Sequence, residues 1–302
     1  MGFSVSGVQI PGRAVEPGLY VVATPIGNLA DITLRALHVL AGATLVACED
    51  TRVSAKLLRH YGIDNRTVSY HEHNANAAGP KIIAALERGG SVALITDAGT
   101  PLVSDPGFRL VAEARAKGIP VWPLPGPSAP VAALSASGMP AETFLFGGFL
   151  PSREIARRKR LRELAGVPAT LIFFESPNRL GRALADIASE LGAERAVTVA
   201  RELTKLHEEF VSMPAGELAE RYREAGVKGE IVLLVAPPDA TAADADPDAL
   251  LAELLERMSV SQAAAEAARL TGVGRRELYQ RALVLSQEGG REDAGEAGDG
   301  QP

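Results

Sequence analysis

The sequence is poor in the residues on which disulfide formation, membrane insertion and base stacking depend. Its 302 residues include one cysteine, Cys48, which excludes an internal disulfide and a cysteine-rich zinc site and favours a cytoplasmic protein. No apolar run approaches the ~18–20 residues of a membrane-spanning helix, and the first residues lack the apolar core of a signal peptide. Eight Phe, five Tyr and one Trp argue against an extended stacking platform for single-stranded RNA.

The common cofactor and catalytic fingerprints are also missing. The first apolar strand is not followed by G-x-G-x-x-G, and G-x-x-x-x-G-K-[ST], H-E-x-x-H and G-x-S-x-G do not occur. A dinucleotide-dependent dehydrogenase and a P-loop NTPase are therefore disfavoured.

The formal net charge of −6 hides an uneven distribution. Residues 239–248 carry four Asp and no base, and residues 288–302 carry five acids and one Arg, so the rest of the chain has a net charge of +2. Two clusters are strongly basic: residues 152–164 hold six bases and two acids, and residues 269–281 hold four bases and one acid. A nucleic-acid partner is compatible with this distribution.

After a flexible start at residues 1–17, residues 18–135 alternate between short apolar strands and amphipathic helices. The strands are expected at 19–24, 44–48, 67–71, 91–96 and 120–124. The helices are expected at 31–41, with Asp31 as the N-cap, and at 52–61, 75–88 and 107–117. This alternation predicts an α/β domain with a largely parallel sheet.

The pattern changes in residues 136–238. Strands are expected at 143–149, 169–174, 196–201, 207–212 and 230–236, with a helix at 177–191. The strands at 196–201 and 207–212 are close enough in sequence for a hairpin, which a purely parallel sheet does not contain. We predict a second, α+β domain with a mixed sheet.

The C-terminal part is expected to contain a linker, a helical unit and a tail. Residues 239–248 have the composition of a flexible linker, and residues 289–302 that of a disordered tail. Between them, residues 249–288 predict three helices with a Gly-containing turn at "TGVGR". This unit is compatible with a helix-turn-helix, and equally with a helical hairpin that packs on its own protein.

Polar and Gly/Pro-rich segments follow the predicted strands directly. In the first domain they are "TPIGNLAD", "CEDTR", "YHEHN", "TDAGTPLVSDPG" and "PGPSAP"; in the second they are "FFESPNR" and "ARELTKLHEE". Ligands of open parallel sheets bind beyond the carboxyl ends of the strands. The sequence therefore predicts a site in a cleft between the two domains.

Seven segments carry a specific resemblance. They are, in chain order, "YVVATPIGNLADIT", "CEDTR", "DAGTPLVSDPG", "PGPSA", "FFESPNRL", "RELTKLHEE" and "GEIVLLV". Over roughly residues 18–287 the chain resembles the small-subunit rRNA methyltransferase family of the tetrapyrrole-methylase superfamily. The resemblance implies a two-domain fold with a helix-turn-helix-like extension, a homodimer, and S-adenosylmethionine-dependent (class III) methylation of the ribose 2′-oxygen of a cytidine in the decoding region of 16S rRNA. The expected partner is 16S rRNA or the small ribosomal subunit.

The resemblance also implies a set of cofactor-binding residues. Superfamily relatives carry a G-D-P-type motif after this strand, where the chain has Gly99-Thr100-Pro101, and Asp97 is the nearby acid that can replace the missing one. A Gly/Pro loop is suited to offering backbone amides and an apolar slot. The expected cofactor-binding residues are Pro25, Asp97, Gly99, Thr100, Pro101, Val103, Ser128, Ala129 and Glu230.

Five side chains are candidates for the general base that accepts the proton of the ribose hydroxyl: Glu49, Asp50, His71, Glu175 and Glu202. Each has a structural alternative. Glu49 or Asp50 can pair with Arg52, and Glu175 with Arg179. His71 and His73 share one face of an extended segment, as packing residues, as acceptor-side contacts or as metal ligands; methyl transfer needs no metal, and we predict none.

The side chains expected to hold RNA phosphates are Arg52, Arg157, Arg158, Arg179, Arg201 and Lys205. The basic run at 152–164 would extend this surface, with a solvated helix face as the alternative reading. Two other functions remain open: a small-molecule methyltransferase of the tetrapyrrole type, and a non-enzymatic RNA-binding or ribosome-assembly protein.

Overall fold

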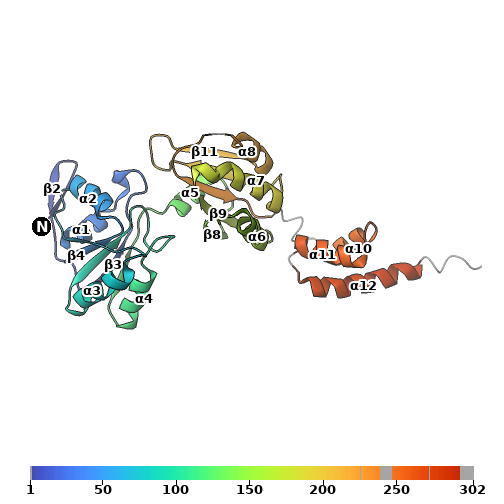
Figure 1. The fold of residues 1–302 in the computed structure, drawn as a ribbon, viewed down its shortest axis with the longest axis horizontal. Coiled ribbons are helices and arrows are strands. Elements are labelled where there is room, and N and C mark those ends of the chain that lie inside the picture. Colours follow the sequence, from blue (N-terminus) through green and yellow to red (C-terminus); the bar gives the residue numbers. More distant parts are fainter. Residues whose placement is uncertain (1, 225, 239–246, 272, 293–302) are drawn as a thin grey trace, which may run out of the picture.

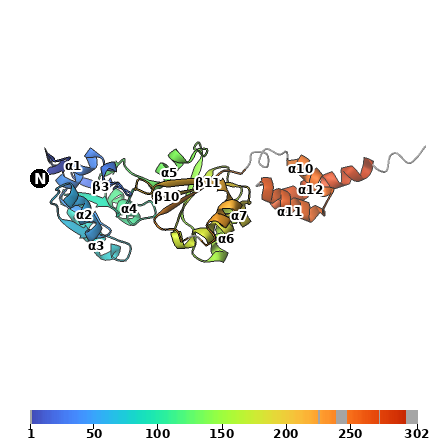
Figure 2. The same cartoon turned by 90° about the horizontal axis from the view of Figure 1, so that it is seen from above.

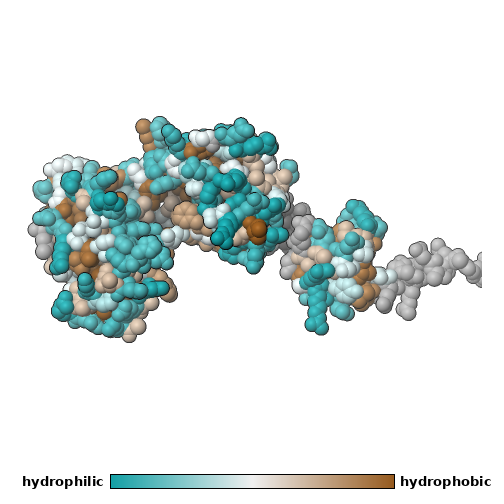
Figure 3. Space-filling model, in the orientation of Figure 1, coloured by the Kyte–Doolittle hydropathy of each residue, from teal (hydrophilic) through white to brown (hydrophobic). Residues whose placement is uncertain are grey.

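The computed structural model describes residues 2–224, 226–238, 247–271 and 273–292. Figures 1 and 2 show two sheet-containing domains and a helical unit arranged in a row. On the face in Figure 3, hydrophobic residues form scattered patches on a mostly hydrophilic surface. None of the helices in these ranges is both long enough and apolar enough to cross a bilayer. The expected linker falls mainly on residues 239–246, outside the described ranges.

The first domain contains a five-stranded parallel sheet in the order β5-β4-β6-β3-β7. Its strands are β3 (Gly18–Val22), β4 (Leu45–Cys48), β5 (Thr67–Ser69), β6 (Ser91–Ile95) and β7 (Val121–Leu124). Its helices are η1 (Leu29–Asp31), α1 (Leu34–Gly42), α2 (Thr51–His60), α3 (Ala75–Glu87) and α4 (Phe108–Ala116). One apolar core joins α1 and α2 to the sheet, and a second core joins α3 and α4 to it. The predicted parallel α/β architecture is confirmed.

Two local predictions in this domain are wrong. Residues 1–17 are not simply flexible, because β1 (Gly2–Val5) and β2 (Val8–Pro11) form an antiparallel hairpin. The Phe3 side chain is fully buried against α1, and the Ser4 amide donates to the Tyr61 carbonyl at 2.7 Å. The first long helix begins after Thr33, whose hydroxyl caps the Ala36 amide, so Asp31 is not its N-cap.

The second domain contains a mixed sheet in the order β11-β10-β12-β9-β8. Its strands are β8 (Phe144–Phe149), β9 (Thr170–Glu175), β10 (Ala196–Arg201), β11 (Glu209–Pro214) and β12 (Ile231–Val235). Its helices are α5 (Ala129–Ser137), α6 (Glu154–Leu164), η2 (Pro177–Arg179), α7 (Leu180–Leu191) and α8 (Ala215–Arg221). The predicted hairpin is present, since β10 and β11 pair antiparallel. Helices α6, α7 and α8 pack on one face of the sheet, and α5 packs on the other.

The C-terminal unit consists of α10 (Pro247–Leu255), α11 (Val260–Thr271) and α12 (Arg275–Glu292). Its small core is built from Leu251, Leu278 and alanines of α11 and α12. The expected disordered tail is wrong for residues 289–292, which continue α12, and its remainder lies outside the described ranges.

Candidate active site

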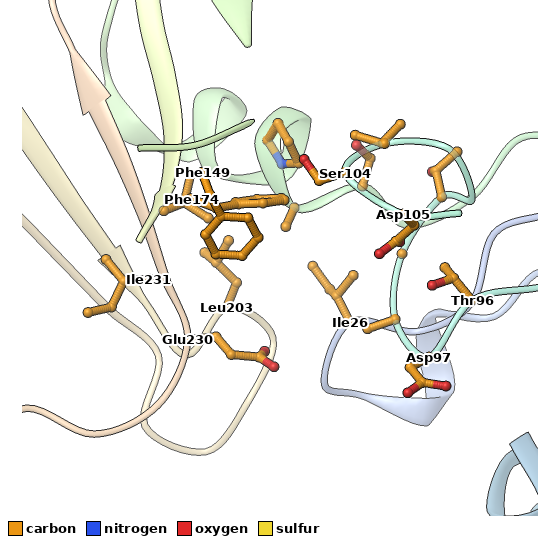
Figure 4. A pocket seen from close by; sticks show the side chains of 18 of the residues that line it. Ile26, Thr96, Asp97, Ser104, Asp105, Phe149, Phe174, Leu203, Glu230 and Ile231 are labelled. Carbon is orange, nitrogen blue, oxygen red and sulfur yellow. The ribbon is translucent and has the colours of Figure 1, made fainter. Parts of the chain in front are cut away.

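A cavity of about 470 Å³ lies between the two sheet-containing domains, beyond the carboxyl ends of β4, β6 and β9 and at the start of β12. Figure 4 shows Thr96, Asp97 and Asp105 on the side of the first domain, and Phe149, Phe174 and Leu203 on the side of the second. A cavity of this size suits a ligand of a few tens of atoms. Its position is the cleft that the strand-end segments predict.

The loop after β6 forms much of the first wall and has an unusual backbone. Leu102 and Ser104 have φ values of 75° and 68°, and Gly99 and Gly107 have values of 83° and 140°. Positive φ is costly for a side chain such as that of Leu102, so the loop must be held by its surroundings. The Gly99 and Thr24 backbones exchange two hydrogen bonds of 3.0 and 2.9 Å, and the Thr100 hydroxyl donates to the Pro127 carbonyl at 2.9 Å.

These bonds attach the loop to the segments that follow β3 and β7. They also occupy the Gly99 amide, which therefore cannot serve as one of the backbone donors expected for the cofactor. The loop's main contribution to the cavity is its shape and its side chains.

Three carboxylates occupy the first wall: Glu49, Asp97 and Asp105. The Thr96 hydroxyl donates to Glu49 Oε2 at 2.9 Å, and the Asp50 amide donates to Asp97 Oδ1 at 3.1 Å. None of the three forms an ion pair with a residue in the described ranges. This wall therefore concentrates negative charge that no direct ion pair within the described ranges neutralises.

Burial affects the acidity of this wall. It raises the pKa of Asp105 to about 6, with the charges of Glu49 and Asp97 adding to the effect and the Thr96 hydroxyl opposing it. Burial also raises the pKa of Asp97. The sequence analysis did not select Asp105 as a candidate base. Its position in the Gly/Pro-rich loop after β6, which also contains Asp97 and Gly99, could have indicated it.

The second wall is largely apolar, and the two carboxylates that also line it, Glu175 and Glu230, pair with Arg179 and Lys205. Leu203 and Val232 are at least nine-tenths buried, and the half-buried Phe174 ring belongs to the same apolar cluster. The Phe149 and Phe174 ring centroids are 5.3 Å apart. The two domains approach closely at two places: a Cβ on Gly27 would lie 2.6 Å from Lys205 Cγ, and one on Gly148 would lie 3.4 Å from Ser104 Oγ.

The cavity brings together most of the predicted cofactor-binding residues. Those that line it are Asp97, Gly99, Thr100, Val103, Ser128, Ala129 and Glu230. Pro25 and Pro101 are buried behind the surface and do not line it. Of the predicted catalytic residues, Glu49 and Glu175 line it, whereas Asp50, His71 and Glu202 do not.

The carboxylates differ in their partners. Asp50 caps α2 and pairs with Arg52 at 2.6 Å, and the Arg52 hydrogen bonds lower the pKa of Asp50 to about 2. Glu175 is fully buried and pairs with Arg179 at 2.9 Å. Asp50 and Glu175 therefore form the ion pairs that the structural alternative predicts. Arg52 pairs with Asp50 and not with Glu49.

Two further candidates lie off the cavity. Glu202 pairs with Lys205 at 2.7 Å, and this hydrogen bond is the main reason that the pKa of Glu202 is lowered. The His71 ring lies beside His73, with 6.1 Å between the ring centroids. No group of three His, Cys, Asp or Glu side chains in the described parts of the chain is arranged to hold a metal ion.

The predicted phosphate-binding cations are mostly paired. Arg157 is 4% exposed and pairs with Asp186 at 2.6 Å, so the prediction that it holds a phosphate is wrong. Arg158 pairs with Glu190 at 2.5 Å, and Arg201 pairs with Glu209 at 3.0 Å. Arg52 remains well exposed, and Arg179 and Lys205 are partly exposed beside their carboxylate partners. Sequence reasoning did not distinguish them from Arg153 and Lys159, which are exposed and form no ion pair within the described ranges.

Family models match the chain in two places. Residues 18–219 match the tetrapyrrole (corrin/porphyrin) methylases. Residues 241–286 match a domain described as the RsmI C-terminal HTH domain.

Curated relatives match nearly the whole chain. A protein of Mesorhizobium japonicum named ribosomal RNA small subunit methyltransferase I is 57% identical, over 96% of this chain and all of the relative. A protein of Pseudomonas aeruginosa with the same name is 48% identical, over 88% of this chain and 96% of the relative.

Solved structures show the same fold at lower identity. The methyltransferase CobJ aligns with a TM-score of 0.55 and 20% identity, over 73% of this chain and 94% of that one. Uroporphyrin-III C-methyltransferase from Thermus thermophilus, complexed with S-adenosylhomocysteine, aligns with a TM-score of 0.51 and 22% identity, over 72% of this chain and 96% of that one.

Proposed function

Because the chain belongs to the ribosomal RNA small subunit methyltransferase I family, within the tetrapyrrole methylases, we propose that this S-adenosylmethionine-dependent rRNA methyltransferase modifies the ribose 2′-oxygen of a cytidine in the decoding region of 16S rRNA. The homodimer that the resemblance implies remains a prediction. Light scattering on the purified protein tests it.

The observation that carries the proposal is the contrast between the two cavity walls. Carboxylates without a direct ion-pair partner in the described ranges suit a cationic ligand and repel a phosphate-bearing one such as a nucleotide cofactor. S-adenosylmethionine carries an ammonium, a sulfonium and a carboxylate, so its net charge is positive, and its adenine is a flat aromatic base. It supplies a methyl group bound to positively charged sulfur, which needs neither a metal nor a phosphate cradle.

The residues of the cavity fit this molecule. Asp97 would attract the cationic end, and the apolar surface of Leu203, Val232 and Phe174 would offer the slot for adenine. Thr100, Ser128 and Ala129 complete the wall of the first domain. We expect the orientation of the methyl group toward the ribose oxygen to contribute most to the rate, because orientation can lower the activation barrier by ~7–11 kcal/mol.

We assign proton removal from the ribose hydroxyl to Asp105. Its pKa of about 6 makes it mainly ionised near neutral pH while still basic enough to accept a proton. Glu49 lies in the same wall and accepts a hydrogen bond of 2.9 Å from the Thr96 hydroxyl. Asp105→Asn should lower kcat by about 10²–10⁴-fold and leave the affinity for S-adenosylmethionine much less changed. A variant that retains wild-type kcat would overturn this assignment.

The RNA backbone is expected to follow the exposed cations of the second domain and the cavity rim. Arg153 and Lys159 offer charges with no competing carboxylate partner within the described ranges, and Arg52 extends into solvent. Such contacts orient RNA without reading its sequence.

The decisive experiment uses tritium-labelled S-adenosylmethionine and small ribosomal subunits from cells that lack this gene. After incubation, the rRNA is digested to nucleosides, and label in 2′-O-methylcytidine is the expected result. Protein that binds S-adenosylmethionine but labels neither subunits nor naked rRNA would point to a small-molecule acceptor. Protein that binds RNA but not S-adenosylmethionine would point to an assembly factor.

A further inference from the structure

We propose that the Phe149 ring stacks on the base of the acceptor nucleotide and so positions that nucleotide in the cavity. This inference rests on the proposed methylation of RNA and identifies a positioning residue for that reaction. It concerns one ring and one base, so the low aromatic content of the chain does not oppose it.

The backbone of β8 is built to turn this ring toward the cavity. β8 pairs in regular parallel register with β9 from Phe144 to Phe146, and the register then shifts before Phe149. In a regular strand, Phe146 and Phe149 would point to opposite faces. Here both rings contact Phe174, with centroid distances of 5.0 and 5.3 Å. The irregularity therefore places Phe149 on the same side as Phe146.

Two glycines make this geometry possible. A Cβ on Gly147 would lie 2.5 Å from a ring carbon of the fully buried Phe173, so only glycine fits there. Gly148 has a φ of +67°, which glycine adopts without strain. The segment is thus specialised for the direction in which Phe149 points.

The exposure of Phe149 indicates a large ligand rather than the cofactor. The ring lines the cavity yet is 60% exposed, whereas Leu203 and Val232, deeper in the same wall, are 8% and 4% exposed. The deep surface suits adenine, and the exposed ring at the rim is accessible to a macromolecule. Figure 4 shows Phe149 and Asp105 on opposite sides of the cavity, so a base on the ring directs its ribose toward the carboxylate wall.

The segment that follows the ring supplies a positive charge suited to a nucleotide. Arg153 follows Phe149 by four residues, is exposed and has no ion-pair partner within the described ranges. Aromatic rings beside cations are the usual combination for unpaired nucleotides, because the ring stacks on the base while the cation neutralises the phosphate.

The test compares Phe149→Ala, Phe149→Leu and Phe149→Tyr in methylation of small subunits. Phe144→Ala is the matched control, since Phe144 lies on the same strand, is 45% exposed and does not line the cavity. Phe149→Ala should lower kcat/KM for the subunit by about 5- to 150-fold, the range for loss of one stacked base. Phe149→Tyr should restore most of it and Phe149→Leu should not, while calorimetry shows S-adenosylmethionine affinity within about twofold of wild type in all variants.

Three outcomes would overturn the inference. Unchanged kcat/KM in Phe149→Ala would show that the ring holds no base. Equal rescue by Leu would indicate that only apolar packing matters. A parallel loss of S-adenosylmethionine affinity would place adenine on the ring. Absence of label with the wild-type enzyme would instead refute the proposed function and this inference with it.

Discussion

The two walls of the cavity are built in different ways, and each way suits a different part of the ligand. The wall of the first domain is a loop with positive φ at Leu102 and Ser104, held by hydrogen bonds from neighbouring loops. Much of the wall of the second domain comes from strands β9 and β12, whose apolar side chains continue into the core. The wall that would bind the cationic part of the ligand thus includes a loop with a strained backbone. The wall that would bind the apolar part is an extension of the core.

The largest effect is expected on the stability of the apolar wall. Leu203→Ala should lower the free energy of unfolding by about 2–5 kcal/mol, because Leu203 is 8% exposed and packs against Ile172 and Val232. Urea denaturation measures the change. Leu206→Ala is the control, since this neighbour is 93% exposed and should change stability by about 0.5 kcal/mol or less. Equal effects would show that this wall is not part of the core.

The next effect concerns the charge of the polar wall. Asp97→Asn should weaken S-adenosylmethionine binding by about 10- to 100-fold, because a hydrogen bond to a charged group contributes about 1.5–3 kcal/mol. Isothermal titration calorimetry measures the affinity. Asp64→Asn removes the same charge from an exposed position outside the cavity and should leave the affinity unchanged. If both variants bind equally well, the polar wall does not select the cation.

The polar wall should also destabilise the fold at neutral pH. The pKa of Asp105 lies near 6 in the folded protein and about 3.9 in an unfolded chain, so between these values the folded state binds more protons and stability falls as pH rises. Asp105→Asn should therefore be more stable than wild type by about 1 kcal/mol at pH 7.5, after allowance for partial exposure. Below pH 4 the difference should vanish. Urea denaturation at both pH values tests this, and a difference that does not depend on pH would contradict it.

The sequence predicted the apolar features of this molecule well. Runs such as Ser91–Ile95 and Ile231–Val235 are strands because they are short, apolar and β-branched, and the parallel order then brings the following loops to one edge. That is why the cavity contains Glu49 and Asp97 as predicted, whereas Glu230, which precedes β12, was expected only from the resemblance.

The missed features depend on contacts between distant residues. Arg157 belongs to a basic run, yet Asp186 on another helix holds it in the interior. The acidity of Asp105 depends on burial by a loop whose positive φ values no residue pattern reveals. The β1–β2 hairpin packs through the fully buried Phe3, with Val5 and Ile10 partly buried against the same core. Each depends on tertiary contacts, which the helix and strand propensities of the local sequence do not predict.

The smallest effect concerns the outer surfaces of the two domains that supply the walls. Lys159→Ala, on the second domain, should weaken binding to the small subunit a few-fold and reduce the slope of log affinity against log salt by about 1, because one phosphate contact is lost. Lys81→Ala removes an exposed lysine from α3 of the first domain and should change neither quantity. Filter binding over a range of salt concentrations measures both. A change of equal size in the two variants would mean that RNA senses only net charge, whereas a change in Lys159→Ala alone would place the RNA path on the domain that provides the apolar wall.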